Sequence, residues 1–170
     1  MSEKKEIDIE LQETLNDIGY ESYTPYKELT PALVGISLHD GKLCYDSDKL
    51  PDDLSDFPME NYHVLIRQKI DYNSGVVFFT EDCYKGTELG ITDDNRVVYD
   101  YDVITNALAK DFANGKGVDI DTLDDDKKHE YWESAREWID YNTIRSLPYD
   151  IMGGKPMPIV IDTEVIEMLS

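Results

Sequence analysis

The sequence predicts an α+β fold of two ββαβ-like repeat units with an added N-terminal helix. Three observations lead to this prediction. Strand–turn–strand patterns begin at residues 33 and 89 and have the same order of residue types. A helical pattern and then an apolar, β-prone run follow each of them. A short amphipathic helix precedes both units.

The chain divides into three parts by composition and pattern. Residues 1–32 form the N-terminal helix and an irregular tyrosine-rich segment, 33–87 the first ββαβ unit, and 88–170 the second ββαβ unit with an inserted helix. With 170 residues, these parts are expected to pack as one compact domain. The twelve tyrosines distinguish the chain from disordered acidic chains, which are poor in aromatic side chains.

The N-terminal helix is predicted from apolar residues three and four positions apart. Ile7, Leu11, Leu15 and Ile18 mark its buried face, and Gly19 is placed to end it.

Each repeat unit opens with a hairpin. The first has strands over 33–37 and 42–48 around the turn His39-Asp40-Gly41. The second has strands over 89–92 and 96–102 around the turn Asp93-Asp94-Asn95. Asp, Asn and Gly favour tight hairpin turns, and both hairpins end in Tyr-Asp-x-Asp.

The later parts of the units also share a pattern. The similar segments 70–74 and 139–143 each end an expected helix, and these helices contain His63 and His129. Apolar strands are predicted next, over 76–81 and 158–163. The second unit has an additional helix over 103–112.

Two aspartates end each hairpin, Asp46 with Asp48 and Asp100 with Asp102. In a strand, side chains two residues apart share one face, roughly 6.7 Å apart. The alternative is that these aspartates cap the helices that follow, because Asp is a preferred N-cap residue.

Five acidic side chains in the C-terminal half recur at spacings of four, three, four and three residues. A helix gathers them on one face about 80° wide. Like charges at this spacing repel one another, so stability alone does not favour them. Trp132 and Trp138 point to the opposite face and are predicted to pack in the core. We call the set the acidic stripe: Asp126, Glu130, Glu133, Glu137 and Asp140.

The whole chain is acidic, with 37 acidic against 16 basic residues and a formal charge of −21. Direct binding to nucleic acid or to an anionic membrane requires clustered basic residues, so this composition argues against both. No stretch approaches the about 20 apolar residues of a membrane span, and no signal-peptide pattern follows Lys4 and Lys5. We therefore expect a cytoplasmic protein in which Cys44 and Cys83 are reduced thiols.

The sequence shows no catalytic motif or paired metal-binding histidines. Asp119, Asp121 and Glu130 match three positions of a calcium-binding loop, but Leu123 and Asp124 stand where it needs a ligand and a glycine. We expect no enzyme, no cofactor and no metal site. Weak divalent-cation attraction to 119–126 and a catalytic carboxylate pair remain open.

The second unit contains Val-Tyr-Asp-Tyr-Asp at 98–102, Trp-Ile-Asp-Tyr-Asn-Thr at 138–143, Pro-Tyr at 148–149 and Pro-Ile-Val at 158–160. In this pattern it resembles the C-terminal part of small uncharacterised acidic proteins of Gram-positive bacteria and their phages. This resemblance implies a mobile-element origin and no particular activity. In charge and size the chain is also similar to DNA-mimicking antirestriction and anti-CRISPR proteins.

These observations predict an inhibitor that occupies the nucleic-acid-binding groove of a basic host protein, such as a nuclease or CRISPR effector. The alternative is an acidic accessory or assembly protein that dimerises or docks through tyrosine-rich surfaces. The target and the oligomeric state, including a homodimer, stay open. The predicted contact residues are the acidic stripe with Tyr141, and secondarily Asp100, Asp102, Asp119 and Asp121.

Overall fold

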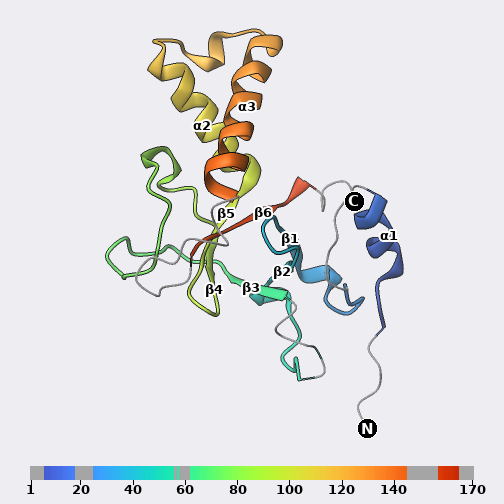
Figure 1. Cartoon of the computed structure of the whole chain (residues 1–170). Helices are drawn as coiled ribbons and strands as arrows, with labels where there is room; N and C mark the ends of the chain where they lie inside the picture. The colour runs from blue at the N-terminus through green and yellow to red at the C-terminus, as the bar shows by residue number, and fades with distance from the viewer. Residues whose placement is uncertain (1–5, 18–24, 56, 58–61, 145–156, 165–170) are drawn as a thin grey trace.

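The computed structural model describes residues 6–17, 25–55, 57, 62–144 and 157–164 and confirms a mixed α+β fold. Its centre is a closed barrel of six strands. Two long helices project from the barrel beyond β5 and β6, and the N-terminal helix α1 (Ile9–Asp17) lies beside the barrel (Figure 1). The predicted N-terminal helix is confirmed over Ile9–Asp17, whereas Ile7 precedes it and pairs with Tyr26 in an isolated β-bridge. Ile18 and Gly19 lie outside the described residues.

The strands pair in chain order, and the last returns to the first. β2 with β3 and β5 with β6 are parallel, whereas the other four pairs are antiparallel. Closure pairs every strand on both sides and leaves no open sheet edge. The strands are β1 (Leu33–Ser37), β2 (Leu43–Asp46), β3 (Tyr62–Ile66), β4 (Gly90–Thr92), β5 (Val97–Asp100) and β6 (Ile159–Asp162).

Both predicted hairpins are confirmed. Gly41 and Asn95 occupy equivalent turn positions with φ values of 71° and 66°. This left-handed conformation suits glycine and asparagine, which explains these residue types at the two turns.

The predicted architecture of two ββαβ repeats is wrong, because the strands of both units close into one barrel and the described residues of the first unit form no α-helix. In the first unit, His63 lies in β3 instead of a helix, and residues 76–81 form no strand. Four of the five residues of β3 are buried. A strand buried on both faces lacks the alternating pattern that identifies an exposed strand, so periodicity alone does not separate it from a buried helix.

The second unit contains two helices between β5 and β6. These are α2 (Tyr101–Gly115) and α3 (Asp125–Ile139), joined through the 3₁₀ turn η5 (Ile120–Thr122). A π-helical turn, η6 (Asp140–Ile144), follows α3. Both helices predicted in this region are confirmed. The similar segments 70–74 and 139–143 adopt different structures, because only the second ends a helix.

The two halves of the barrel nevertheless have equivalent strand pairing. In the first half, β3 runs parallel to β2 and antiparallel to β4. In the second half, β6 likewise runs parallel to β5 and antiparallel to β1. A glycine permits the close approach at each junction. A Cβ atom on Gly35 would lie 2.7 Å from the Asp162 carbonyl oxygen, and one on Gly90 would lie 2.1 Å from the Ile66 carbonyl oxygen.

The apolar core has two main parts. Leu11 and Leu15 of α1 pack with residues of β1, β2 and β3. The inner faces of α2 and α3 pack with β5 and β6 and with segment 76–84. The second part fixes the base of the helical hairpin against the barrel.

Candidate functional site

We call α2 and α3 the helical hairpin, and an aspartate side chain caps the N-terminus of each of these helices. Asp100 accepts a hydrogen bond of 3.0 Å from the backbone N–H of Asp102 at the start of α2. Asp124 accepts one of 2.9 Å from the backbone N–H of Lys127 at the start of α3. Each cap satisfies an N–H group that has no partner within the helix.

The capping alternative is therefore confirmed for the aspartates that end the hairpins. Asp46 accepts a hydrogen bond of 3.0 Å from the backbone N–H of Asp48, as Asp100 does from Asp102. Asp48 and Asp102 lie beyond the strands, so neither pair shares a strand face.

The two helices of the hairpin pack through small and branched side chains. Ile104, Leu108 and Ala109 of α2 are buried in the same cluster as Ala135 and Ile139 of α3. Burial of this face leaves the opposite face of α3 to solvent.

All five carboxylates of the acidic stripe are solvent-exposed. Four lie on α3, and Asp140 begins η6. Glu133 lies 3.1 Å from Nε2 of His129, and Asp140 accepts a hydrogen bond of 2.6 Å from the Tyr101 hydroxyl. The structure thus brings the five predicted residues together on one accessible face.

The other predicted contact residues lie at the two ends of the α2–α3 hairpin. Tyr141 follows the stripe and is 69% exposed. Asp119 and Asp121 are exposed at η5, and Asp100 and Asp102 lie at the first turn of α2. Because α2 is about 22 Å long, the two aspartate pairs occupy opposite ends of the hairpin.

Asp100 and Asp102 have structural roles that limit them as contact residues. Asp100 also accepts a hydrogen bond of 2.9 Å from the Thr163 hydroxyl. Burial, together with the negative charges of Glu164, Asp100 and Asp162, raises the pKa of Asp102 to about 6. Asp102 therefore gives up its negative charge more readily than an ordinary aspartate as the pH falls.

A stacked column beside the stripe was not predicted. The Arg136 guanidinium lies 4.9 Å from the ring centroid of Trp132 and 5.2 Å from that of Tyr101. Its Nε donates a hydrogen bond of 3.2 Å to the Tyr101 hydroxyl, and the His129 ring stacks on Trp132. Trp138 packs against the core as predicted, whereas Trp132 is half-buried within this column. The spacing of four residues between Trp132 and Arg136 is the signal that indicates their contact.

A second group missed by the sequence reasoning joins the β1–β2 turn to β3. Nε2 of His63 lies 2.9 Å, and Nε2 of His39 lies 3.4 Å, from the same carboxylate oxygen of Asp40. Burial raises the pKa of Asp40, but the hydrogen bonds from His63 and the Lys42 backbone N–H outweigh it and hold the pKa well below its usual range. Burial lowers the pKa of His39. The group fixes the turn to the barrel.

This histidine group does not form an accessible nucleophilic site. The Ser37 hydroxyl lies 3.1 Å from Nδ1 of His39, but Ser37 is completely buried. Burial raises the pKa of the Cys44 thiol to about 12 and that of the half-buried Cys83 thiol to about 11. Both cysteines are free thiols, and neither is activated as a nucleophile.

Among the described residues, no group of three or more His, Cys, Asp or Glu side chains is arranged to hold a metal ion. Asp119 and Asp121 belong to the η5 turn, and Glu130 lies in the second turn of α3. Segment 119–130 is therefore a turn and a helix, not a calcium-binding loop.

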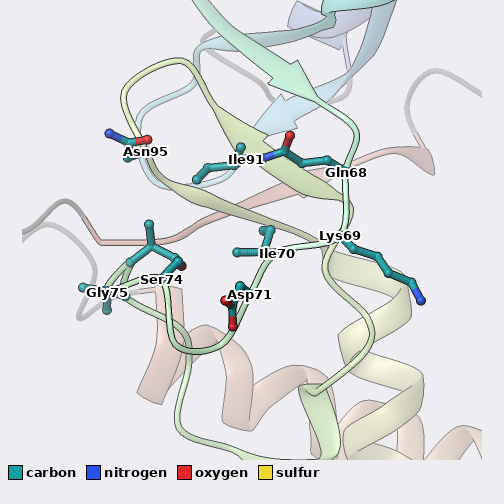
Figure 2. A pocket seen from close by; sticks show the side chains of 10 residues that line it. Gln68, Lys69, Ile70, Asp71, Ser74, Gly75, Ile91 and Asn95 are labelled. Atoms are coloured by element: carbon teal, nitrogen blue, oxygen red, sulfur yellow. The ribbon is translucent and has the colours of Figure 1, made fainter.

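One hollow lies between segment 68–77 and the β4–β5 hairpin and has a volume of about 660 Å³. Figure 2 shows Ile91 and Asn95 on one side and Ile70, Asp71 and Ser74 on the other. The Lys69 side chain extends away from the hollow (Figure 2). The Asp71 carboxylate already accepts a 2.9 Å hydrogen bond from the Asn73 backbone N–H. The hollow thus offers mainly apolar walls.

Comparison with known proteins gives no match to a family model, a curated protein or a solved structure. In the described part of the chain, no helix has the length and apolar character needed to cross a membrane.

Proposed function

We propose that this protein is an acidic interaction protein that inhibits a nucleic-acid-binding host protein, such as a nuclease or CRISPR effector. In this proposal the acidic stripe occupies the partner's basic groove and its carboxylates take the places of phosphates. The observation that carries the proposal is the exposure of all five stripe residues along the projecting helix α3 and the start of the η6 turn that follows it.

The charge density of the stripe supports this proposal. Its five carboxylates extend over about 21 Å of helix, and one strand of DNA carries about six phosphates over the same length. The formal charge of −21 adds a long-range attraction to basic proteins, which raises the rate of encounter.

The position of the stripe also favours docking into a groove. The α2–α3 hairpin projects from the barrel, and its far end carries η5 with Asp119 and Asp121 (Figure 1). A folded hairpin avoids the ordering cost that a disordered acidic segment has on binding. We assign the contact with the partner protein to the acidic stripe, Tyr141, Asp119 and Asp121, and do not include Asp100 and Asp102 in it.

The tyrosine-based docking alternative has less support. Five of the nine described tyrosines are buried, namely Tyr45, Tyr62, Tyr84, Tyr99 and Tyr101. The exposed ones, Tyr72 and Tyr141, lie on separate segments of the chain. We therefore prefer charge-based binding, without a catalytic role.

The test is a pull-down from bacterial lysate at about 50 and about 500 mM salt, with mass spectrometry of the captured proteins. We expect a nucleic-acid-binding protein that is captured at low salt and released by added DNA or RNA. A partner that resists high salt and has no affinity for nucleic acid would instead support the docking alternative.

Two triple variants assign the binding to the stripe. Substitution of Glu130, Glu133 and Glu137 by Gln should abolish capture. The control replaces the exposed Glu10 and Glu13 by Gln and Asp17 by Asn on α1, which changes the net charge equally. Equal loss in both variants would show that only net charge matters and would contradict the assignment.

A further inference from the structure

The two halves of the barrel place equivalent side chains around one mouth. Asp46 ends β2 and Asp100 ends β5, and the parallel neighbours of these strands lead into Arg67 and Thr163. In each half, that residue donates a hydrogen bond to the aspartate: Arg67 Nε to Asp46 at 3.0 Å and Thr163 Oγ1 to Asp100 at 2.9 Å. All four residues line one cavity of about 330 Å³.

The mouth is asymmetric in charge despite this equivalent geometry. Arg67 supplies a cation that neutralises Asp46, whereas the two donors to Asp100 are the neutral Thr163 hydroxyl and the Asp102 backbone N–H. Lys49 lines the same cavity and adds a second cation on the Arg67 side. One side of the mouth is therefore positive and the other negative.

The hydrogen bonding leaves capacity for a ligand on both sides. Arg67 uses Nε for Asp46 while 47% of its side chain is exposed, so its terminal nitrogens remain available as donors. Each carboxylate oxygen of Asp100 accepts one of these hydrogen bonds and has a second lone pair. Ala32, Leu33, Val34 and Leu89 complete the cavity with apolar walls.

The negative side is reinforced by its surroundings. The raised pKa of Asp102, to about 6, results from burial and from Glu164, Asp100 and Asp162. Among the charges that act on Asp102, the cation Arg136 has the smallest effect, so the balance of negative charge favours a cationic group next to Asp100. A simple anion would be attracted by Arg67 and Lys49 but repelled by the negative side around Asp100. A simple cation would be attracted by Asp100 but repelled by Arg67 and Lys49.

We propose that the barrel mouth binds a small zwitterion of the α-amino-acid class. Its carboxylate contacts Arg67 and Lys49, and its ammonium group contacts Asp100. The cavity volume lies at the lower end of the range for small-molecule sites, which fits a ligand of this size. This site is separate from the acidic stripe and does not depend on the proposed function.

The test screens the twenty L-amino acids against the full chain at about 10 mM, by thermal shift and by amide chemical shifts of residues 32–34 and 163. The best ligand is compared with its 2-hydroxy-acid analogue, which lacks the ammonium group, and with its decarboxylated amine. Each analogue should bind at least about tenfold more weakly, because it loses a charge-assisted hydrogen bond. Equal binding of an analogue, or no shift at the mouth with any amino acid, would overturn the proposal.

Variants locate the site. Asp100→Asn and Arg67→Gln should each weaken binding at least about tenfold. Asn is as good an N-cap residue as Asp, so the first change keeps α2 intact. Asp48→Asn, an exposed neighbour outside the cavity, is the matched control and should bind like the original chain. The stripe variant with Gln at 130, 133 and 137 should also retain ligand binding, which separates this site from the proposed function.

Discussion

Tyr101 connects the two helices of the hairpin through its hydroxyl group. The hydroxyl donates to the Asp140 carboxylate at 2.6 Å and accepts from Arg136 Nε at 3.2 Å. The ring is buried and lies against the Arg136 guanidinium. One side chain from the start of α2 thus determines where the end of α3 lies.

Replacement of Tyr101 by Phe should lower the free energy of unfolding by about 1–2 kcal/mol, because two hydrogen bonds to charged groups are lost while the ring stays. Urea unfolding measures this change. Tyr131→Phe is the control and should change stability little, because Tyr131 contacts Lys116 through its ring, which stays. Equal effects of the two changes would contradict the role given to the Tyr101 hydroxyl.

The roles of single residues can be predicted best where a side chain acts on the backbone close to it in the sequence. The turn residues Gly41 and Asn95 and the capping aspartates Asp46 and Asp100 act on backbone groups within a few residues. Contacts such as Tyr101 with Asp140, 39 positions apart, carry no local signal.

At the scale of elements, α3 depends on its cap because few of its residues are buried. Only Ala135 and Ile139 are buried along this helix. The acidic stripe opposes the helix through repulsion between carboxylates four residues apart. The Asp124 cap and the negative charges in the first turn stabilise its start.

Asp124→Ala should therefore destabilise the protein by about 1 kcal/mol through the loss of the cap. Asp124→Asn removes the same charge but keeps a capping side chain, so it should have a much smaller effect. Thermal unfolding followed by far-ultraviolet circular dichroism compares the two. If both variants lose the same stability, charge and not capping is the cause.

The strand β3 shows where element prediction failed. The segment Tyr-His-Val-Leu-Ile contains His63, for which the sequence predicts a helix, but it forms a strand. Parallel pairing with β2 buries both faces of the strand and removes the alternation of apolar and polar residues. The length and the β-branched and aromatic content of the segment favour a strand.

At the scale of the whole molecule, closure of the barrel depends on two backbone contacts. Gly90→Ala should destabilise the protein by at least about 1–3 kcal/mol, because its Cβ would lie 2.1 Å from the Ile66 carbonyl oxygen. Gly35→Ala should act in the same direction. Gly115→Ala, at the end of α2 with no atom within 4 Å of its Cβ, is the control and should be neutral or slightly stabilising. Chemical denaturation of the three variants checks this order.

The raised pKa of Asp102 predicts a pH dependence of stability. Burial is the main cause of its raised pKa, about 6 against an ordinary value of 3.8, followed by Glu164, Asp100 and Asp162. The folded state holds this proton more tightly than the unfolded state, so this group's contribution to stability falls as the pH rises from about 4 to about 6.

In the Asp102→Asn variant, the side chain at position 102 cannot ionise, so stability no longer falls through its ionisation as the pH rises. The variant should be more stable than the original chain at about pH 7 and equally stable near pH 4, as measured by thermal unfolding across this range. Asp121→Asn, in the exposed η5 turn, is the matched control for net charge. The same pH-dependent gain in both variants would attribute the effect to net charge and not to the surroundings of Asp102.

Local patterns in the chain are enough to predict the two hairpins, the capping aspartates, the N-terminal helix and the acidic face of α3. These features depend on residue types and spacings within one or two turns of chain, where the backbone rules act. The folded molecule is needed to show that the strands close into one barrel, that Arg67 and Thr163 reach Asp46 and Asp100, and that His63 contacts Asp40. These contacts join residues 21 to 63 positions apart. They depend on which strands pair and in which direction, and no local pattern specifies that choice.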